Sequence, residues 1–223
     1  MKKKILYTLI FSILVLIGLI YISNYDYLLN AVSKIYFKGH TTAYIDDFKQ
    51  FDNNILSPSK NPQVWPNHEK YNSITLPKAL EAHHKKTQTT AFVIIKNDSI
   101  YFEKYYDGYG PESKSNSFSV AKSYVSALLG KAIMQGYIKG LDQRVKDFIP
   151  DLKGLYANEV TVGDLASMAS GQRWDEAYYS PFSVTTAAYF VKDLDKLILN
   201  QPVDEKPGKK YIYKSGTTQL LGM

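Results

Sequence analysis

Residues 117–123 read Ser-Phe-Ser-Val-Ala-Lys-Ser, and a helix-forming apolar stretch continues from there to Gln135, with Gly136 as its stop. On a helix that begins near Phe118, Ser119 and Lys122 lie one turn apart and point the same way. A serine hydroxyl becomes a nucleophile when a neighbouring base removes its proton, and a neutral lysine can act as that base. This stretch therefore predicts a serine nucleophile with a lysine partner.

The surroundings of Lys122 favour that interpretation, because an exposed lysine stays charged near neutral pH. On a helical wheel Lys122 lies between Leu129 and Ile133, inside one apolar stripe, and burial there lowers the pKa of an amine. The stripe consists of Phe118, Ala121, Val125, Leu128, Leu129, Ala132 and Ile133. The alternative is that Ser119 caps the helix and Lys122 extends along the surface. The same spacing recurs at Ser57–Lys60, where Pro58 prevents a helix, so spacing alone assigns nothing.

Strand signals precede this helix and further helix signals follow it. Residues 91–95 and 99–105 are rich in β-branched and aromatic side chains, and Asn97-Asp98 can turn the chain between them, which predicts an antiparallel hairpin. Thr161 and Asp164 form the pattern of a capping box, which predicts a helix to about Ser170. Another helix is expected over Thr185–Leu199. Strands followed by helices favour an α+β fold.

The N-terminus predicts a membrane anchor. Three lysines precede an uncharged run over residues 5–23, which is long enough to cross the hydrocarbon core of a bilayer. The positive-inside rule keeps residues 1–4 in the cytoplasm. A cleaved signal peptide and a buried core helix are the alternatives. We expect residues 24–70 to form a stalk or linker and residues 71–223 to form the folded domain.

Composition excludes several kinds of site. The chain has 223 residues, 45% of them apolar and 22% charged, as in a folded protein, and it has no cysteine. Disulfides, cysteine-ligated zinc, iron–sulfur clusters and a thiol nucleophile are therefore excluded. Half of the formal charge of +6 comes from residues 2–4, which argues against nucleic-acid binding. His83 and His84, followed by two lysines, predict a solvated surface patch, and we expect no metal site and no cofactor.

Five separated segments, in this order, resemble the serine β-lactamase and penicillin-recognising hydrolases. The likeness is to the class C-like branch, which contains 6-aminohexanoate-dimer hydrolases and related esterases. The segments are residues 92–106, Ser117–Ser123, Gly140–Leu152, Thr161–Gly171 and Pro207–Gly222. The resemblance implies a β-lactamase/transpeptidase-like fold, an antiparallel sheet beside a helical domain.

By that resemblance Ser119 is the acylated nucleophile and Lys122 its proton partner. Tyr213, in Tyr213-Lys214-Ser215, would move the proton of Ser119 to the leaving group, with Tyr211 as the alternative among the 19 tyrosines. Ser215 is expected on the substrate side.

Tyr178, in the segment Trp174–Tyr178, matches the place of a substrate-contacting tyrosine in the 6-aminohexanoate-dimer hydrolase branch, and ordinary packing is its alternative.

One element of the family pattern has no counterpart between Tyr213 and Met223. It is a Lys/His-Ser/Thr-Gly-like strand that supplies one N–H of the oxyanion hole. We therefore expect an incomplete sheet and a chain truncated at its C-terminus, inactive or poorly folded as written, because one lost oxyanion donor costs about 10²–10³-fold in rate.

The sequence as a whole predicts a single-pass protein of the bacterial cytoplasmic membrane, with a serine hydrolase domain facing the periplasm. Its expected partners are the membrane and a small amide or ester, such as a carboxylic ester, a β-lactam-like amide or an amino-acid oligomer. Two alternatives remain: a D,D-peptidase or carboxypeptidase acting on cell-wall peptides, and a catalytically silent anchored binding protein.

Overall fold

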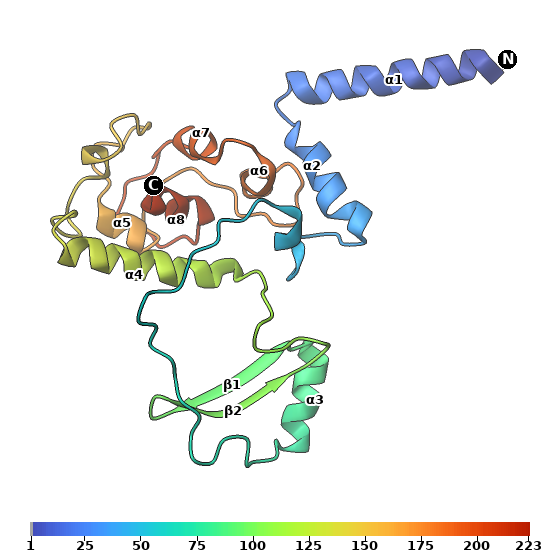
Figure 1. The fold of residues 1–223 in the computed structure, drawn as a ribbon. Coiled ribbons are helices and arrows are strands. Elements are labelled where there is room, and N and C mark those ends of the chain that lie inside the picture. The colour runs from blue at the N-terminus through green and yellow to red at the C-terminus, as the bar shows by residue number, and fades with distance from the viewer. Residues whose placement is uncertain (1) are drawn as a thin grey trace. The chain divides into compact units, whose positions relative to one another are not determined.

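The computed structural model describes residues 2–223 and divides them into two compact units, which we describe separately. One unit comprises the described residues up to Asp47 together with Ser117–Met223, and the other comprises Phe48–Asn116. Figure 1 labels the helices and strands. They are α1 (Lys2–Ile22), α2 (Tyr27–Lys34), α3 (Lys78–Thr87), β1 (Ala91–Lys96), β2 (Ser99–Tyr105), α4 (Ala121–Met134), α5 (Val162–Ala166), α6 (Val184–Phe190), α7 (Leu194–Leu199) and α8 (Ser215–Gly222). Short 3₁₀ turns cover Tyr36–Lys38, Asp47–Gln50, Phe118–Val120 and Val145–Asp147.

The smaller unit contains α3 and a two-stranded antiparallel sheet (Figure 1). Asn97 and Asp98 both adopt positive φ, 49° and 56°, which is the backbone of a type I′ hairpin turn. The register pairs Ile94 with Phe102, and Phe102 is buried. The predicted hairpin is therefore confirmed, and the small antiparallel sheet together with the helices gives the expected α+β class.

His84 corrects one expectation in this unit. The sequence placed the His83–His84 pair on a solvated patch, but His84 is buried on α3. Its ring lies 4.7 Å from that of Phe92 and 5.5 Å from that of Tyr106, centroid to centroid. Helix α3 thus directs the His84 side chain against the aromatic rings of the hairpin region. Composition alone does not reveal that contact.

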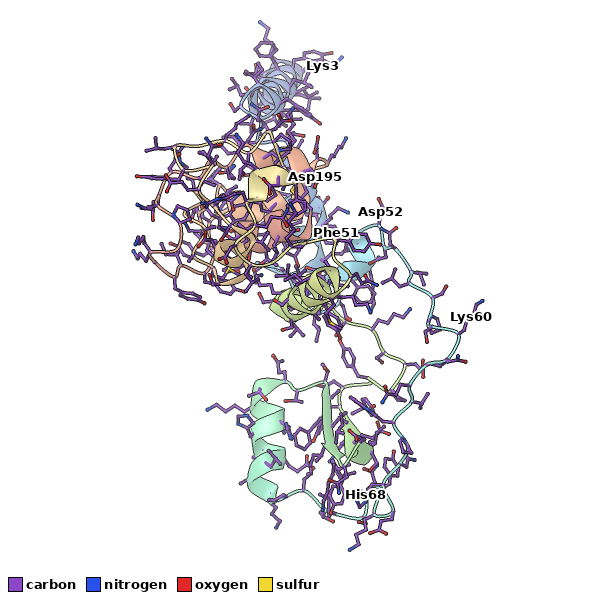
Figure 2. All side chains as sticks on the ribbon, turned by 90° about the vertical axis from the view of Figure 1, so that its left-hand side faces the viewer. Lys3, Phe51, Asp52, Lys60, His68 and Asp195 are labelled. Atoms are coloured by element: carbon purple, nitrogen blue, oxygen red, sulfur yellow. The ribbon has the colours of Figure 1, made fainter. Side chains whose placement is uncertain are left out.

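The segment from Phe51 to Lys60 has neither helix nor strand, and Figure 2 labels Phe51, Asp52 and Lys60 along it. Ile55 and Leu56 are strongly exposed despite being apolar. Pro58 cannot donate a backbone hydrogen bond, which agrees with the irregular path of the segment. Ser57 and Lys60, which have the same spacing as Ser119 and Lys122, therefore do not lie on a helix.

The larger unit is built around one apolar core to which α5, α7, α8 and the connecting loops contribute. Its buried members are Val145, Leu152, Ala157, Val160, Leu165, Ile198, Val203 and Leu220. Gly154 and Gly171 let their backbone pack directly against another backbone segment at the edge of this core. Both have positive φ, and a Cβ at either would meet the backbone of residues 203 or 205 at 2.4 Å or less.

Capping explains where the helices of this unit begin. The capping box of Thr161 and Asp164 is present in full at the start of α5. The stretch 185–199 forms two helices instead of the single one expected. The carboxylate of Asp193 accepts a hydrogen bond from the N–H of Lys196, which begins α7 afresh after α6 has ended.

Helix α2 packs against α6, although its residues fall in the segment expected to be a stalk. Tyr27 and Ala31 are buried on α2, and Ile35 is buried just after it. The Tyr27 hydroxyl donates to the carbonyl oxygen of Pro181 at 3.0 Å, and the Asn30 amide donates to that of Phe190 at 3.2 Å. The predicted linker is thus divided: residues up to Asp47 belong to the larger unit, and the rest begin the smaller one.

Helix α1 is the one helix of the described chain that is long and apolar enough to cross a membrane, over Lys3–Ile22. Its apolar side chains are exposed. A signal sequence near the N-terminus has the same character, so the helix is a candidate for either role.

Candidate active site

Ser119 lies in the 3₁₀ turn that leads into α4, at the N-terminal end of that helix. The residue before it, Phe118, has a φ of +44°, a conformation that costs a residue other than glycine about 1–3 kcal/mol. The turn leaves the serine side chain exposed. The helix dipole at this end favours negative charge, such as that of a developing alkoxide.

Two side chains hydrogen-bond this serine, and a third, Ser215, reaches it through Lys122. The Tyr213 hydroxyl donates a hydrogen bond of 2.6 Å to the Ser119 Oγ. The Lys122 Nζ donates to the same oxygen at 3.3 Å and to the Ser215 Oγ at 3.2 Å. Lys122 Nζ also lies 5.1 Å from the centre of the Tyr213 ring, within cation–π range. The structure thus brings together four of the five residues that the sequence singled out.

Tyr213 and Ser215 are held by the packing at the start of α8. A Cβ on Gly216 would lie 2.2 Å from the Trp174 ring, so only glycine lets α8 begin against that indole. The Trp174 Nε1 in turn donates to the Thr185 hydroxyl at 2.9 Å. One residue further on, Thr217 is fully buried and shares a hydrogen bond of 2.8 Å with Ser170.

Glu176 is a site residue that the sequence did not single out. Its carboxylate accepts hydrogen bonds from the Ser215 N–H at 2.7 Å and from the Ser215 hydroxyl at 2.6 Å. Because Ser215 also accepts from Lys122, a continuous chain of hydrogen bonds runs from the lysine to the carboxylate. Only its place two residues before Tyr178 could have indicated this role.

Tyr178 lies at the edge of this group. Its hydroxyl donates to the Glu176 carboxylate. Burial and, next, the hydrogen bond to Glu176 raise the pKa of Tyr178, so it remains a phenol at neutral pH. Tyr211, the alternative to Tyr213, is two-thirds exposed, and the hydroxyl bonded to Ser119 is that of Tyr213.

The apolar stripe of α4 is not buried as expected. Within α4, all of which the structure describes, Leu129 is the buried residue, whereas Leu128 is 67% exposed. Lys122 is partly buried, by its contacts with Tyr213 and Ser215 and not by the stripe. The helical wheel thus placed the lysine in the site but gave the wrong surroundings for it.

Among residues 2–223, no group of three or more histidine or acidic side chains could hold a metal ion. The chemistry that this site can perform therefore has to be sought in its hydroxyls, amine and carboxylate.

Comparisons with known proteins show which family the chain resembles. The sequence model of the β-lactamase family matches residues 77–223. The 6-aminohexanoate-dimer hydrolase of Paenarthrobacter ureafaciens is 28% identical over 104 residues, which make up 47% of this chain and 26% of that protein.

Two solved structures share the fold. The "Putative 6-aminohexanoate-dimer hydrolase from Bacillus anthracis" has a TM-score of 0.53 at 19% identity, over 75% of this chain and 47% of that one. The "putative beta-lactamase from Bacteroides dorei DSM 17855" has a TM-score of 0.50 at 21% identity, over 65% and 43%. The chain thus spans under half the length of these relatives.

The family match covers well over half of the chain and includes Ser119, Lys122 and Tyr213. The fold agrees with it, and the family predicted from the sequence is confirmed. This chain belongs to the β-lactamase family.

Proposed function

We propose that this protein is a serine hydrolase that cleaves small amides or esters through an acyl-enzyme on Ser119. The observation that carries the proposal is the convergence of the Tyr213 hydroxyl, at 2.6 Å, and the Lys122 amine, at 3.3 Å, on one serine oxygen. Two donors aimed at a single hydroxyl stabilise the alkoxide that forms when the hydroxyl loses its proton.

Acylation then follows from these contacts. The Ser119 Oγ attacks the carbonyl carbon, and its proton passes to the oxygen of Tyr213 while the phenol's own proton moves on toward the leaving group. As the bond to the leaving group breaks, Tyr213 gives the proton to the departing oxygen or nitrogen. A water molecule afterwards attacks the acyl carbon, loses its proton to Tyr213, and the acid leaves while Ser119 regains a proton.

Ser215 and Glu176 keep the lysine in place in this scheme. Lys122 donates to Ser215, and Ser215 donates to the Glu176 carboxylate at 2.6 Å, so the charge of the amine faces an opposite charge through one hydroxyl. The name of the Paenarthrobacter relative supports a linear amide such as an amino-acid oligomer as one substrate class.

A fluorophosphonate probe tests the proposal, because it phosphonylates an activated serine and reports on it without a known substrate. The full-length protein should be labelled at Ser119, and Ser119→Ala should lose the label. Ser123→Ala, one turn further along the same helix, is the matched control and should label as wild type does. Labelling that persists in Ser119→Ala, or no labelling of folded wild type, would leave a catalytically silent binding protein as the better description.

We further propose that α1 is an uncleaved single-pass anchor in a bacterial cytoplasmic membrane, with the site on the outer side. Its charge-free span behind three lysines supports this orientation. Alkaline carbonate extraction should leave the full-length chain in the membrane pellet, and external protease should digest residues 24–223 in spheroplasts. A shortened, soluble chain would instead indicate a cleaved signal peptide.

A further inference from the structure

An apolar cavity of about 220 Å³ adjoins the proposed active site within the larger unit. Phe118, the residue before the nucleophile, lines it, and so does Tyr178, whose hydroxyl bonds the Glu176 carboxylate. The cavity thus begins one residue away from Ser119.

The opposite wall comes from the segment that the sequence predicted as a stalk. Ala31 and Ile35 of the α2 region line the cavity, and the loop that follows contributes Thr42 and Ala43. The α6 side contributes Phe190, which is itself buried. The packing of α2 on α6 described above therefore has a consequence: it closes a hollow that Phe118, the neighbour of Ser119 in the chain, also lines.

The lining determines what can enter. Every lining residue is uncharged, and all of them lie within residues 2–223. Neither a substrate ammonium nor a carboxylate would find a compensating charge on these walls, and burying an unpaired charge is costly. A cavity of about 150 Å³ suffices for benzene, so this one has room for about six to nine carbon atoms. Its volume is below the range of about 300–1,000 Å³ that is typical of sites for whole drug-sized ligands.

We propose that this cavity binds an uncharged apolar arm of the substrate, a short alkyl chain or a single ring next to the scissile ester or amide bond. The inference rests on the proposed function, because that function places the scissile bond of the bound substrate at Ser119. It specifies the substrate class: neutral, medium-chain acyl or alkyl compounds are preferred to charged ones of the same length.

The first experiment measures binding without chemistry. Ligand-observed NMR gives the affinity of the full chain, held in lipid nanodiscs, for propanamide, butanamide and hexanamide, with empty nanodiscs as the blank. Affinity should rise about fourfold per methylene, and Ser119→Ala should bind equally well. Hexylammonium and hexanoate should bind at least tenfold more weakly than hexanamide. Affinity that does not change with chain length, or equal binding of the charged compounds, would overturn the proposal.

Two variants locate the binding in this cavity. Ala43→Phe fills it from a partly exposed loop, and Thr42→Asp places a charge at its exposed rim. Each should weaken hexanamide binding at least fivefold, whereas the control Ala166→Phe, on the exposed side of α5, should not change it. Wild-type affinity in both folded variants would place the ligand elsewhere and refute the inference.

The second experiment separates this inference from the proposed function. Hexyl fluorophosphonate should label Ser119 at least fivefold faster than its ethyl analogue, and Ala43→Phe should remove that advantage. If neither probe labels the protein but affinity still rises with chain length from propanamide to hexanamide, the hydrolase proposal fails and the pocket proposal stands. If both label at equal rates, in wild type and variant alike, the pocket proposal fails and the hydrolase stands.

Discussion

Most of the active site lies where α4 and α8 begin, but the two helices are packed very differently. Helix α8 is set into the core of the larger unit, where Leu220 is 2% exposed and Thr217 is fully buried. Helix α4 follows Ser119 and carries Lys122, yet Leu128 at its middle is 67% exposed. The tyrosine and Ser215 are therefore fixed by core packing, whereas the serine and lysine depend on the contacts they make across to α8.

This difference shows how the site is organised. The Lys122–Ser215 and Tyr213–Ser119 hydrogen bonds join the two helices, at 3.2 and 2.6 Å. Substitutions in the α4 half should therefore change the chemistry more than the stability. Substitutions in the core of α8 should do the reverse. The predictions below test that division, beginning with the largest expected effect.

Replacing Lys122 by alanine should slow fluorophosphonate labelling about 10²–10⁴-fold, the range expected for loss of a proton-transfer partner. The free energy of unfolding should change little, because the amine is held by two hydroxyl contacts and not by a buried apolar shell. Labelling rates and urea denaturation measure the two quantities. Lys131→Ala, in the last turn of the same helix, is the control. Turnover within a few-fold of wild type would make Lys122 a surface group.

A matched pair of leucines tests the packing difference directly. Leu220→Ala should cost about 2–5 kcal/mol of unfolding free energy, because it opens a cavity in the core. Leu128→Ala removes the same atoms from an exposed position and should stay within about 0.5 kcal/mol of wild type. Urea denaturation of both variants gives the comparison. Equal losses would mean that α4 is buried to the same degree as α8.

Tyr213→Phe removes the hydroxyl that lies 2.6 Å from the Ser119 oxygen and keeps the ring under Lys122. Labelling or turnover should slow by about 10²-fold if this hydroxyl transfers the proton. Tyr211→Phe makes the same chemical change at an exposed neighbour and should have no effect. If the two variants exchange these outcomes, Tyr211 is the proton carrier.

Glu176→Gln tests the carboxylate behind Ser215 as a positioning residue. The amide keeps one acceptor oxygen where the carboxylate offers two to Ser215, and it loses the charge. Labelling should therefore slow about tenfold, in keeping with one charge-assisted hydrogen bond. The pH titration profile of Tyr178 should also move to lower pH, because the neutral amide no longer helps to raise the pKa of that phenol. Glu159→Gln, on an exposed loop, is the control. A slower rate with an unmoved profile would point to a structural role alone.

Much of this arrangement could be predicted from local sequence patterns. The hairpin turn at Asn97-Asp98 and the capping box at Thr161 depend on residues within four positions of each other, and both are present. The serine–lysine spacing likewise follows from a single helical turn. Tyr213 lies 94 positions from Ser119, and its place beside the serine could be anticipated only through the family resemblance.

The features that the sequence did not yield all depend on distant contacts. Glu176 acts through Ser215, 39 positions away, and locally only its place near Tyr178 points to it. The residues that join α2 to the α6 region are more than 150 positions apart in the sequence, so the α2 segment resembled a linker. The helical wheel of α4 described its periodicity correctly but could not say which surface would cover the apolar side.

Lys214, between Tyr213 and Ser215 where α8 begins, offers the test with the smallest expected effect. It is buried, its amine donates to the carbonyl oxygen of Gln172, and burial lowers its pKa. The unfolded chain, where a lysine titrates near 10.4, then binds more protons than the folded one between the lowered pKa and about pH 10. In that window this residue makes the free energy of unfolding rise with pH, and below the window it lowers stability by a constant amount.

Lys214→Met should remove this dependence. The stability of the variant relative to wild type should therefore be highest near pH 7 and should decline toward pH 10, as the wild-type lysine loses its charge. Urea denaturation at the two pH values measures the change, and Lys131→Met, with an exposed amine, should show none. A constant difference between Lys214→Met and wild type would mean that the core around α8 does not desolvate this amine. The packing contrast between the two helices would then be weaker than their exposed fractions suggest.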